Sequence, residues 1–499
     1  MNKLKLLIGT IILSSIIVSC SNDKNSIDKS NENNIQIQQN NFTKNLSIPK
    51  NIKANENYIL TAQNLTTSIN GKNIKVLGYT ENGILGPTII AQKGDDLNIT
   101  LKNKLTEETN IHWHGLLAPS KMDGYPSNVI KEGDSFNYSF KINQRAGMYW
   151  YHPHPHGKTS KQAYLGLAGV FIVNDDEEKK LNLPSGNYEI PLVIQDKKLN
   201  ENSLDYNPNM NDVMTGFMGK DILINGELSP NLNVSTRYYR FRILNGSNAR
   251  VYNLAFSNNA KFSVIGSDGG LLSKAEEVSS LLLSPGERAD ILVDFSKYEI
   301  GSETYLQSNI FEGSLSQGKE AFKILKLSIK NKEENTFKIP EKLSNIDIIP
   351  TSSSVKTRIF DINGIPMMGN TNQMNHGSMN IKNTMGMAMH TINKKVFDIN
   401  RIDEIVKAGS NEIWEFDNST GDEIHSMHLH NVQFQVLERS GARNNLLAIE
   451  KGFKDTILLM PKEKVKIIIN FPENKGKYLV HCHNLEHEDD GMMLNFMIE

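Results

Sequence analysis

Residues 478–492 read YLVHCHNLEHEDDGM, and the triplet His481-Cys482-His483 within them indicates the kind of fold that the chain adopts. Side chains on a β-strand alternate between two faces. A strand here would therefore point His481 and His483 to one side and the sulfur of Cys482 to the other. One strand would then contribute to two different metal sites.

The Cys482 side of that strand offers a distinctive set of metal ligands. One thiolate, two imidazoles and a weak axial Met make up a blue copper site. His487 and Met492 follow Cys482 at suitable distances along the chain, and His425 can supply the second nitrogen. Zinc also accepts thiolate and imidazole, so a zinc site is the alternative interpretation.

Most of the other histidines are concentrated in two distant segments. Of 13 histidines, five lie in 112–156 and six in 425–487, and none occurs between 157 and 375. They form four His-x-His units, which are His112-Trp113-His114, His152-Pro153-His154, His428-Leu429-His430 and the triplet at 481–483. On strands, each unit presents two imidazoles to one side. Eight imidazoles with no carboxylate among them favour copper over zinc or iron.

Outside these segments the chain has the pattern of an all-β protein. Short β-branched runs, such as Leu97–Leu101 and Val465–Ile469, alternate with Gly, Asn, Pro and Asp, which is typical of β-sandwiches or barrels. At ~150 residues per domain, the 499 residues suggest about three domains. Short polar linkers separate three predicted domains, at 48–175, 186–330 and 345–499.

The N-terminus has the features of an export signal. Two lysines precede an apolar stretch that ends in IVSC at Cys20. This ending resembles the lipobox of bacterial lipoproteins, in which the Cys is acylated, and it predicts a signal peptide over 1–20; a plain secretory signal is the alternative. Residues 21–47 are predicted to form a polar tether, because they lack the apolar side chains needed to fold. We expect a lipid-anchored chain at the periplasmic or outer face of a bacterial cell envelope.

Composition narrows the classes of partner. Lys plus Arg is 54 and Asp plus Glu is 56, so the net charge is −2. A nucleic-acid partner is not expected, since such proteins carry a clear basic excess. No run of 18 apolar residues occurs, so membrane contact is expected only through the lipid anchor. We expect a monomer.

The four His-x-His segments resemble the copper signatures of multicopper oxidases. The resemblance extends over about 48–499 and includes Gly86–Ile89, Arg240–Asn245 and Ser284–Asp290. It implies three consecutive cupredoxin-like domains of Greek-key topology, with a three-copper cluster between the first and the third. It also implies four copper ions: a type 1 copper bound by His425, Cys482, His487 and Met492; a type 2 copper bound by His112 and His428; and a type 3 pair bound by His114, His152, His154, His430, His481 and His483.

The resemblance also implies how protons reach the cluster. A multicopper oxidase reduces dioxygen to water and consumes protons in doing so. Glu488 and Asp123 match family positions that relay protons, and we predict that role for both. Asp490, two residues beyond Glu488, is expected to be a surface carboxylate.

A methionine-rich insert in the third domain bears on the reductant. The segment 367–389 holds seven of the 18 methionines, and soft thioether ligands select Cu(I). It resembles the insert of the copper-efflux cuprous oxidases, so Cu(I) is the expected substrate. The candidate substrate-site residues are Met367, Met368, Met385, Met387, Met389, Asp422 and Glu423.

Three alternatives to cuprous oxidation stay open at this point. A laccase-like phenol oxidase would share every copper ligand, and oxidation of iron or manganese is also compatible with the sequence. A non-catalytic protein that sequesters copper at the cell surface belongs to another class. The complete set of twelve predicted ligands favours an enzyme, because sequestration requires no site for dioxygen.

Overall fold

The computed structural model describes residues 41–80, 83–314, 316–362 and 389–499. The predicted signal peptide, Cys20 and most of the tether lie outside the described residues. Among the described residues, none of the helices has the length and apolar character needed to cross a bilayer.

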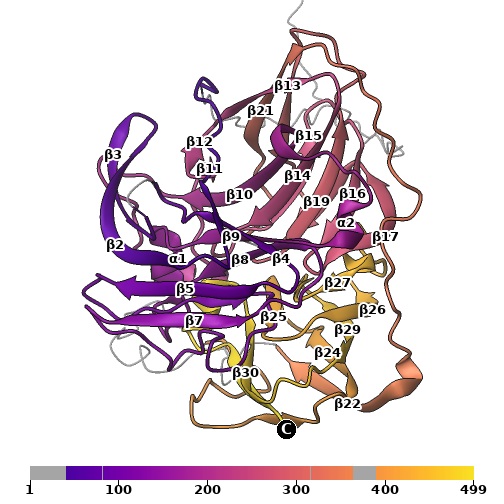
Figure 1. Ribbon diagram of the computed structural model, residues 1–499. Helices are drawn as coiled ribbons and strands as arrows, with labels where there is room; N and C mark the ends of the chain where they lie inside the picture. Colours follow the sequence, from indigo (N-terminus) through magenta and orange to yellow (C-terminus); the bar gives the residue numbers. More distant parts are fainter. Residues whose placement is uncertain (1–40, 81–82, 315, 363–388) are drawn as a thin grey trace, which may run out of the picture. The chain divides into compact units, whose positions relative to one another are not determined.

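The first third of the chain forms two β-sheets that enclose a common apolar core (Figure 1). Strand order in the first sheet is β1-β4-β9-β8-β6, with β1 (Asn51–Lys53), β4 (Thr88–Gln92), β9 (Gly169–Asn174), β8 (Gly147–His152) and β6 (His112–His114). Strand order in the second is β3-β2-β5-β7, with β3 (Lys72–Gly78), β2 (Tyr58–Ile69), β5 (Asp96–Asn103) and β7 (Ser135–Lys141).

The middle third repeats this two-sheet arrangement. One sheet has the order β12-β11-β10-β14-β19-β16-β17, with β12 (Glu227–Leu228), β11 (Asp221–Ile224), β10 (Glu189–Lys197), β14 (Tyr238–Asn245), β19 (Arg288–Asp294), β16 (Phe262–Ser267) and β17 (Gly270–Val278). The other has the order β13-β21-β20-β15-β18, with β13 (Asn231–Ser235), β21 (Phe322–Asn331), β20 (Glu303–Ser308), β15 (Tyr252–Phe256) and β18 (Ser280–Leu283).

The last third contains the strands that carry the second group of histidines. One sheet has the order β22-β24-β29-β26-β27, with β22 (Ser354–Asp361), β24 (Asn411–Asn418), β29 (Glu463–Asn470), β26 (Phe434–Gly441) and β27 (Phe453–Lys454). The other has the order β23-β31-β30-β25-β28, with β23 (Glu404–Val406), β31 (Met493–Ile498), β30 (Gly476–Cys482), β25 (His425–Leu429) and β28 (Thr456–Leu459).

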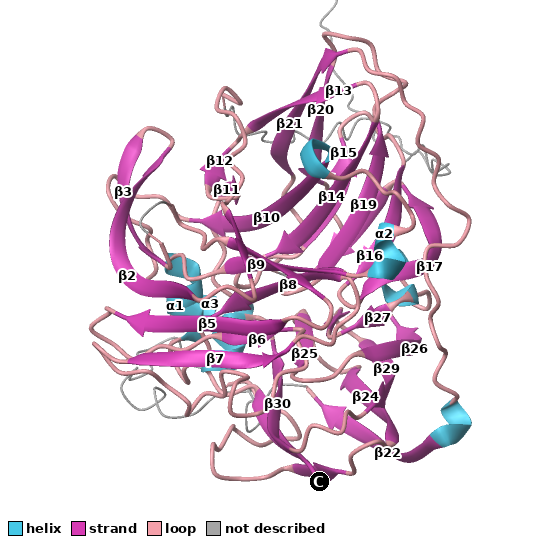
Figure 2. Ribbon diagram, viewed as in Figure 1, coloured by secondary structure: helices cyan, strands magenta, loops and turns pink. Residues whose placement is uncertain are grey.

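Helices are short and few among the described residues (Figure 2). They are α1 (Thr159–Leu165), α2 (Asp176–Lys179), α3 (Met210–Thr215) and α4 (Leu485–Asp489), with 3-10 turns at Gly186–Tyr188, Thr351–Ser353 and Ala448–Lys451. Both α1 and α3 pack against α4, the helix that carries His487. The all-β prediction is confirmed, and two of the helices lie beside the one that carries His487.

Candidate metal centre

Strand register brings the histidines of each domain together. In the first domain β6 pairs antiparallel with β8, and His112 lies opposite His152. In the third domain β25 pairs antiparallel with β30, and His428 lies opposite His481. Cross-strand neighbours point to the same face of a sheet. Each domain therefore presents a group of imidazoles on one face.

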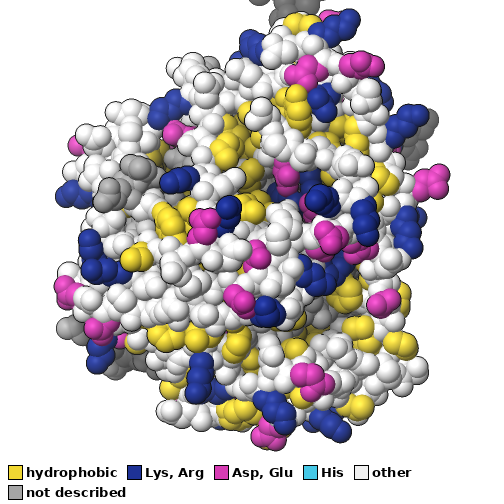
Figure 3. All heavy atoms as spheres, in the orientation of Figure 1, with side chains coloured by type: hydrophobic (Ala, Val, Ile, Leu, Met, Phe, Trp, Pro, Cys, Tyr) yellow, Lys and Arg dark blue, Asp and Glu magenta, His cyan; other side chains and the backbone are white. Residues whose placement is uncertain are grey.

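The two groups meet between the first and third domains. They form what we call the eight-histidine cluster, which consists of His112, His114, His152, His154, His428, His430, His481 and His483. The Nε2 atoms of His112 and His428 are 3.3 Å apart, and the Nε2 of His481 lies 3.1 Å from that of His430. Three groups within the cluster have donor atoms close enough to share one ion. All eight rings are buried, and Figure 3 shows no histidine on the face that it draws.

The outer nitrogens of several rings are held by oxygen acceptors. The Nδ1 atoms of His112 and His428 donate to the carbonyl oxygens of Asp123, at 2.8 Å, and Asp455, at 2.9 Å. The Nδ1 of His430 donates to the carboxylate of Asp123 at 2.8 Å. A hydrogen bond donated by one ring nitrogen fixes the tautomer and leaves the other nitrogen free to bind a metal. These rings therefore offer Nε2 toward the interior of the cluster.

His114 is held the other way round. Its Nε2 lies 3.1 Å from the Asp455 carboxylate and 3.0 Å from the Thr456 hydroxyl, and its Nδ1 has no hydrogen-bond partner in the described part of the chain. His152 Nε2 and both nitrogens of His483 also lack a partner there. Burial lowers the pKa of His152 and His483, with neighbouring imidazoles adding to the effect. Buried neutral nitrogens without partners require an explanation, and a bound metal provides one.

The two predicted proton-relay carboxylates both contact the cluster. Glu488 lies 3.1 Å from His481 Nδ1 and 3.4 Å from His154 Nδ1. Burial opposes ionisation of Glu488, but these two imidazoles lower its pKa to about 2. Asp123 contacts His112 of the first domain and His430 of the third. Burial raises the pKa of its carboxyl. Both carboxylates therefore lie against ring nitrogens of the cluster.

The middle domain supports the cluster although it supplies no histidine. Arg288 of β19 donates to both carboxylate oxygens of Asp455, at 2.6 and 2.5 Å, and to the carbonyl oxygen of Met148 in the first domain. Gly286, with φ +82°, lies so close that a Cβ would be 3.0 Å from His483 and 3.1 Å from His114. Arg288 therefore joins three domains at the cluster, and Gly286 leaves room for its rings.

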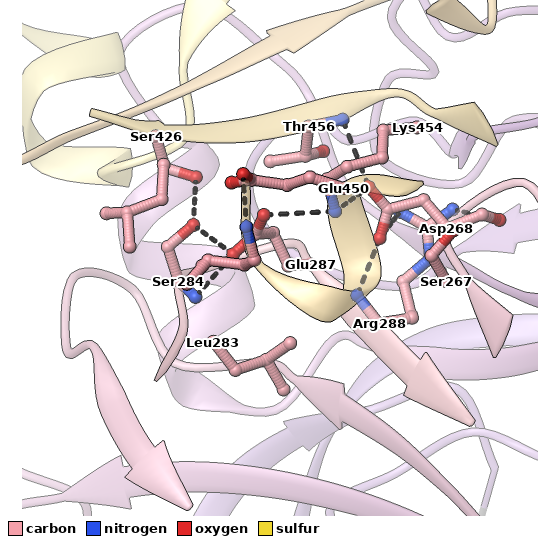
Figure 4. Close-up of polar contacts among 12 residues, drawn as sticks. Ser267, Asp268, Leu283, Ser284, Glu287, Arg288, Ser426, Glu450, Lys454 and Thr456 are labelled. Atoms are coloured by element: carbon pink, nitrogen blue, oxygen red, sulfur yellow. Dashed lines mark hydrogen bonds and ion pairs between the residues drawn. The ribbon is translucent and has the colours of Figure 1, made fainter. Parts of the chain in front are cut away.

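Further charged side chains are buried beside Arg288 (Figure 4). Lys454 lies 2.9 Å from Asp268 and 3.0 Å from Glu287, and all three are buried. Asp268 also accepts the backbone N–H of Arg288 at 2.7 Å. Sequence reasoning missed Asp455 and its ion pair with Arg288, because neither residue has a spacing relation to a histidine.

The second group of ligands surrounds Cys482 on the opposite face of β30. Its sulfur lies 3.6 Å from His425 Nδ1 and 3.7 Å from His487 Nδ1. We call these three residues the Cys482 triad. Met492 is adjacent, since its carbonyl accepts from Cys482 N–H and its N–H donates to the carbonyl of His487. Burial raises the pKa of Cys482 to about 12, and a bound cation would favour its thiolate.

His487 is enclosed on its outer side. Its Nε2 donates to the carbonyl oxygen of Met214 in α3 at 3.0 Å, which leaves Nδ1 free on the sulfur side. The ring of His390 stacks on it with centroids 3.8 Å apart. Asp490, expected at the surface, is instead largely buried and accepts from Met389 N–H, His390 N–H and His390 Nδ1. That expectation was wrong, because the chain around 389–390 packs over Asp490.

The predicted substrate residues are only partly brought together. Met389 is fixed beside the Cys482 triad through Asp490, while Met367, Met368, Met385 and Met387 lie outside the described residues. Asp422 is exposed and pairs with Lys462 at 2.7 Å. Glu423 is half-buried and accepts from Ser316 at 3.1 Å.

Comparison with known proteins identifies the family. Three sequence profiles of the multicopper oxidase family match residues 61–178, 195–326 and 368–499. This chain belongs to the multicopper oxidases. The multicopper oxidase mco of Staphylococcus haemolyticus is 37% identical over 444 residues, which cover 88% of this chain and 87% of that protein.

Solved structures agree with the assignment. The multicopper oxidase McoA of Aquifex aeolicus has a TM-score of 0.81 at 35% identity, covering 91% of this chain and 99% of its own. A multicopper oxidase of Campylobacter jejuni, described as a metallo-oxidase, has a TM-score of 0.78 at 30% identity and covers 93% and 98%. The expectation of three cupredoxin-like domains is confirmed for this multicopper oxidase.

Copper is the metal that family membership implies, and the side chains present fit it. The Cys482 triad provides a thiolate and two imidazoles, with Met492 adjacent. The eight-histidine cluster provides partnerless nitrogens at His114, His152 and His483. The zinc alternative is set aside, because a multicopper oxidase accounts for both groups of ligands.

Proposed function

We propose that this multicopper oxidase oxidises Cu(I) to Cu(II) in copper detoxification and passes the electrons to dioxygen, which is reduced to water. The balance is four Cu(I), one dioxygen and four protons to four Cu(II) and two waters. The observation that carries the substrate is the anchoring of the methionine-rich insert. Its last residue, Met389, and the following His390 are bound to Asp490 beside His487.

The ligand assignment is part of the proposal. The Cys482 triad with Met492 would hold the type 1 copper, His112 and His428 the type 2 copper, and the other six histidines of the cluster the type 3 pair. When bound, these four coppers take electrons singly from the substrate and deliver them together to dioxygen. Asp123 orients His112 and His430, Glu488 orients His154 and His481, and we assign both carboxylates to proton delivery.

Two features of the chain favour Cu(I) over a phenol. Thioethers select soft monovalent copper, and seven of them occupy 367–389. His487, the triad histidine whose Nε2 points away from the sulfur, is fully buried. A bulky phenol therefore has no direct contact with it. A laccase-like oxidase is the second candidate, and oxidation of iron or manganese or a copper-sequestering role are the others.

The test replaces residues 367–388 with a short Gly-Ser linker and keeps Met389 and His390 in place. The expected result is slower oxidation of Cu(I), faster oxidation of a bulky phenol and an unchanged blue colour. The physical reason is that the variant loses the soft ligands and the bulk of the insert that ends at Met389. Oxygen uptake with each substrate measures both rates.

A matched control keeps the bulk and removes the sulfur. In it the six methionines of 367–388 become leucine, a change that nearly conserves volume. This control should lose Cu(I) oxidation without gaining phenol oxidation. Equal rates of the wild type and both variants on both substrates would make a laccase-like enzyme the better description, and a wild type without oxygen uptake would favour sequestration.

The proposed location is the periplasmic or outer face of the cell envelope, with a lipid anchor on Cys20. The support is the IVSC lipobox and the polar segment 21–47 behind it. Cys20→Ser should move the protein from the membrane fraction to the soluble fraction. Unchanged membrane attachment of this variant would contradict the anchor.

A further inference from the structure

Helix α3 carries polar and soft groups that the proposed chemistry leaves unused. This helix belongs to the middle domain, which supplies no predicted copper ligand. Yet the carbonyl oxygen of Met214, near its C-terminal end, accepts from His487 Nε2 at 3.0 Å. The middle domain thus contacts His487, a proposed type 1 ligand, on the side of the ring that points away from Cys482.

A buried carboxylate fixes α3 in that position. Glu486, the residue before His487, accepts the backbone N–H of Phe217 at 3.0 Å and the hydroxyl of Tyr206 at 3.0 Å. These two residues flank α3 on either side. Gly216, with φ +93°, permits the close approach, since a Cβ there would lie 2.8 Å from Asn484 Nδ2. These contacts of Glu486 hold both ends of α3 against the segment that carries His487.

The outer face of α3 carries two exposed methionines. Met210 is 47% exposed and Met214 is 38% exposed. They are four residues apart, so their thioethers lie on the same side of the helix. Neither belongs to the buried apolar core of the described residues. Two solvent-accessible thioethers on one face form a pair of soft ligands suited to a monovalent d10 cation.

The covering of His487 makes this pair important for electron entry. His487 is fully buried, with Met214 and Asn484 at its Nε2 and His390 stacked on its face. A reductant in solution therefore has no direct contact with the ring. Covalent bonds lead from the Met214 side chain to its own carbonyl oxygen. One hydrogen bond joins that oxygen to His487 Nε2.

We propose that Met210 and Met214 of α3 bind the Cu(I) substrate at the point where its electron enters the enzyme. This inference rests on the proposed function and adds to it a site in the middle domain, separate from 367–389. The bound Cu(I) loses one electron, which passes through Met214 and His487 to the type 1 copper. The product is Cu(II), which leaves because thioethers are poor ligands for the harder ion.

The test is the double variant Met210→Leu with Met214→Leu, which nearly conserves volume and hydrophobicity. The KM for Cu(I) should rise by about tenfold. The blue absorption should stay unchanged. Titration of the copper-loaded protein with Ag(I), a redox-inert substitute for Cu(I), should show one fewer bound ion than in the wild type.

Met497→Leu is the matched control, since Met497 is a half-buried methionine on β31 that contributes to neither proposed site. It should retain the wild-type KM and Ag(I) stoichiometry. If the α3 double variant also retains both, the α3 site is wrong. If the double variant behaves like the wild type while the linker variant of 367–388 loses Cu(I) oxidation, the proposed function stands and this inference falls. A wild type that never oxidises Cu(I) removes the proposed function and this substrate site together.

Discussion

The Cys482 triad and the eight-histidine cluster are neighbours across one strand, but they are held in different ways. The triad takes its three ligands from the third domain and lies in that domain's apolar core. The cluster takes four rings from the first domain and four from the third, with Arg288 of the middle domain behind it. The first site therefore takes all its ligands from the packing of one domain, and the second needs rings from two domains that a third supports.

The largest effect is expected from a change on the triad side. Cys482→Ser should abolish the blue colour and substrate oxidation, because the thiolate-to-copper charge transfer and the electron path are lost. Copper content should fall by about one ion per chain, since the cluster keeps its own ligands. Absorption spectra and metal analysis measure both quantities.

Met492→Leu provides a graded comparison with this variant. A thioether would bind copper held by the Cys482 triad only weakly, so its removal should keep the blue colour and change the reduction potential. A Cys482→Ser protein that stays blue would show that the triad does not hold the type 1 copper. A Cys482→Ser protein without any copper would show that the two sites are not independent.

An intermediate effect is expected where the domains meet. Arg288→Met leaves the Asp455 carboxylate buried without its ion-pair partner, which costs about 3–5 kcal/mol. We expect a lower Tm and loss of copper from the eight-histidine cluster, with the blue colour retained. Thermal unfolding and metal analysis test this expectation.

A surface ion pair serves as the control for Arg288. Lys53 and Glu56 lie 3.1 Å apart and are both exposed, so Lys53→Met should change the free energy of unfolding by less than about 1 kcal/mol. An Arg288→Met protein with wild-type Tm and copper content would show that the middle domain does not support the cluster.

The smallest effect is expected from a change that preserves both sites. Glu488→Gln keeps the shape of the side chain beside His154 and His481 but removes its ability to deliver a proton. Copper content and colour should be unchanged, while turnover at saturating Cu(I) should fall by about a hundredfold. Steady-state oxygen uptake over a range of pH measures it. Unaltered turnover would exclude Glu488 as the relay and leave Asp123 as the remaining candidate.

Much of the site could be predicted from the sequence, because the spacing of its ligands is a local property of the strands that carry them. The alternation of side chains along a strand separates Cys482 from His481 and His483 without knowledge of the fold. The clustering of histidines in 112–156 and 425–487 indicates that two distant segments meet. β-branched runs between turn residues identify an all-β chain for the same local reason.

The residues that sequence reasoning missed act only through tertiary contacts. Asp455 and Arg288 are far apart in the chain and meet only when β19 and β28 lie beside the cluster. Asp490 is the last of three consecutive acidic residues, and the sequence around it does not distinguish it from the other two. It is largely buried because His390 packs over it. No spacing rule distinguishes such residues from solvated ones.

The sequence by itself determined that this protein is an all-β chain with one thiolate site and one imidazole cluster, since side-chain type and alternation are local properties of each strand. Only the tertiary structure decided which groups surround those sites. The carbonyl of Met214 reaches His487, and Arg288 reaches Asp455, because domains pack against one another. Such contacts depend on positions in space, and residue order carries no direct record of them.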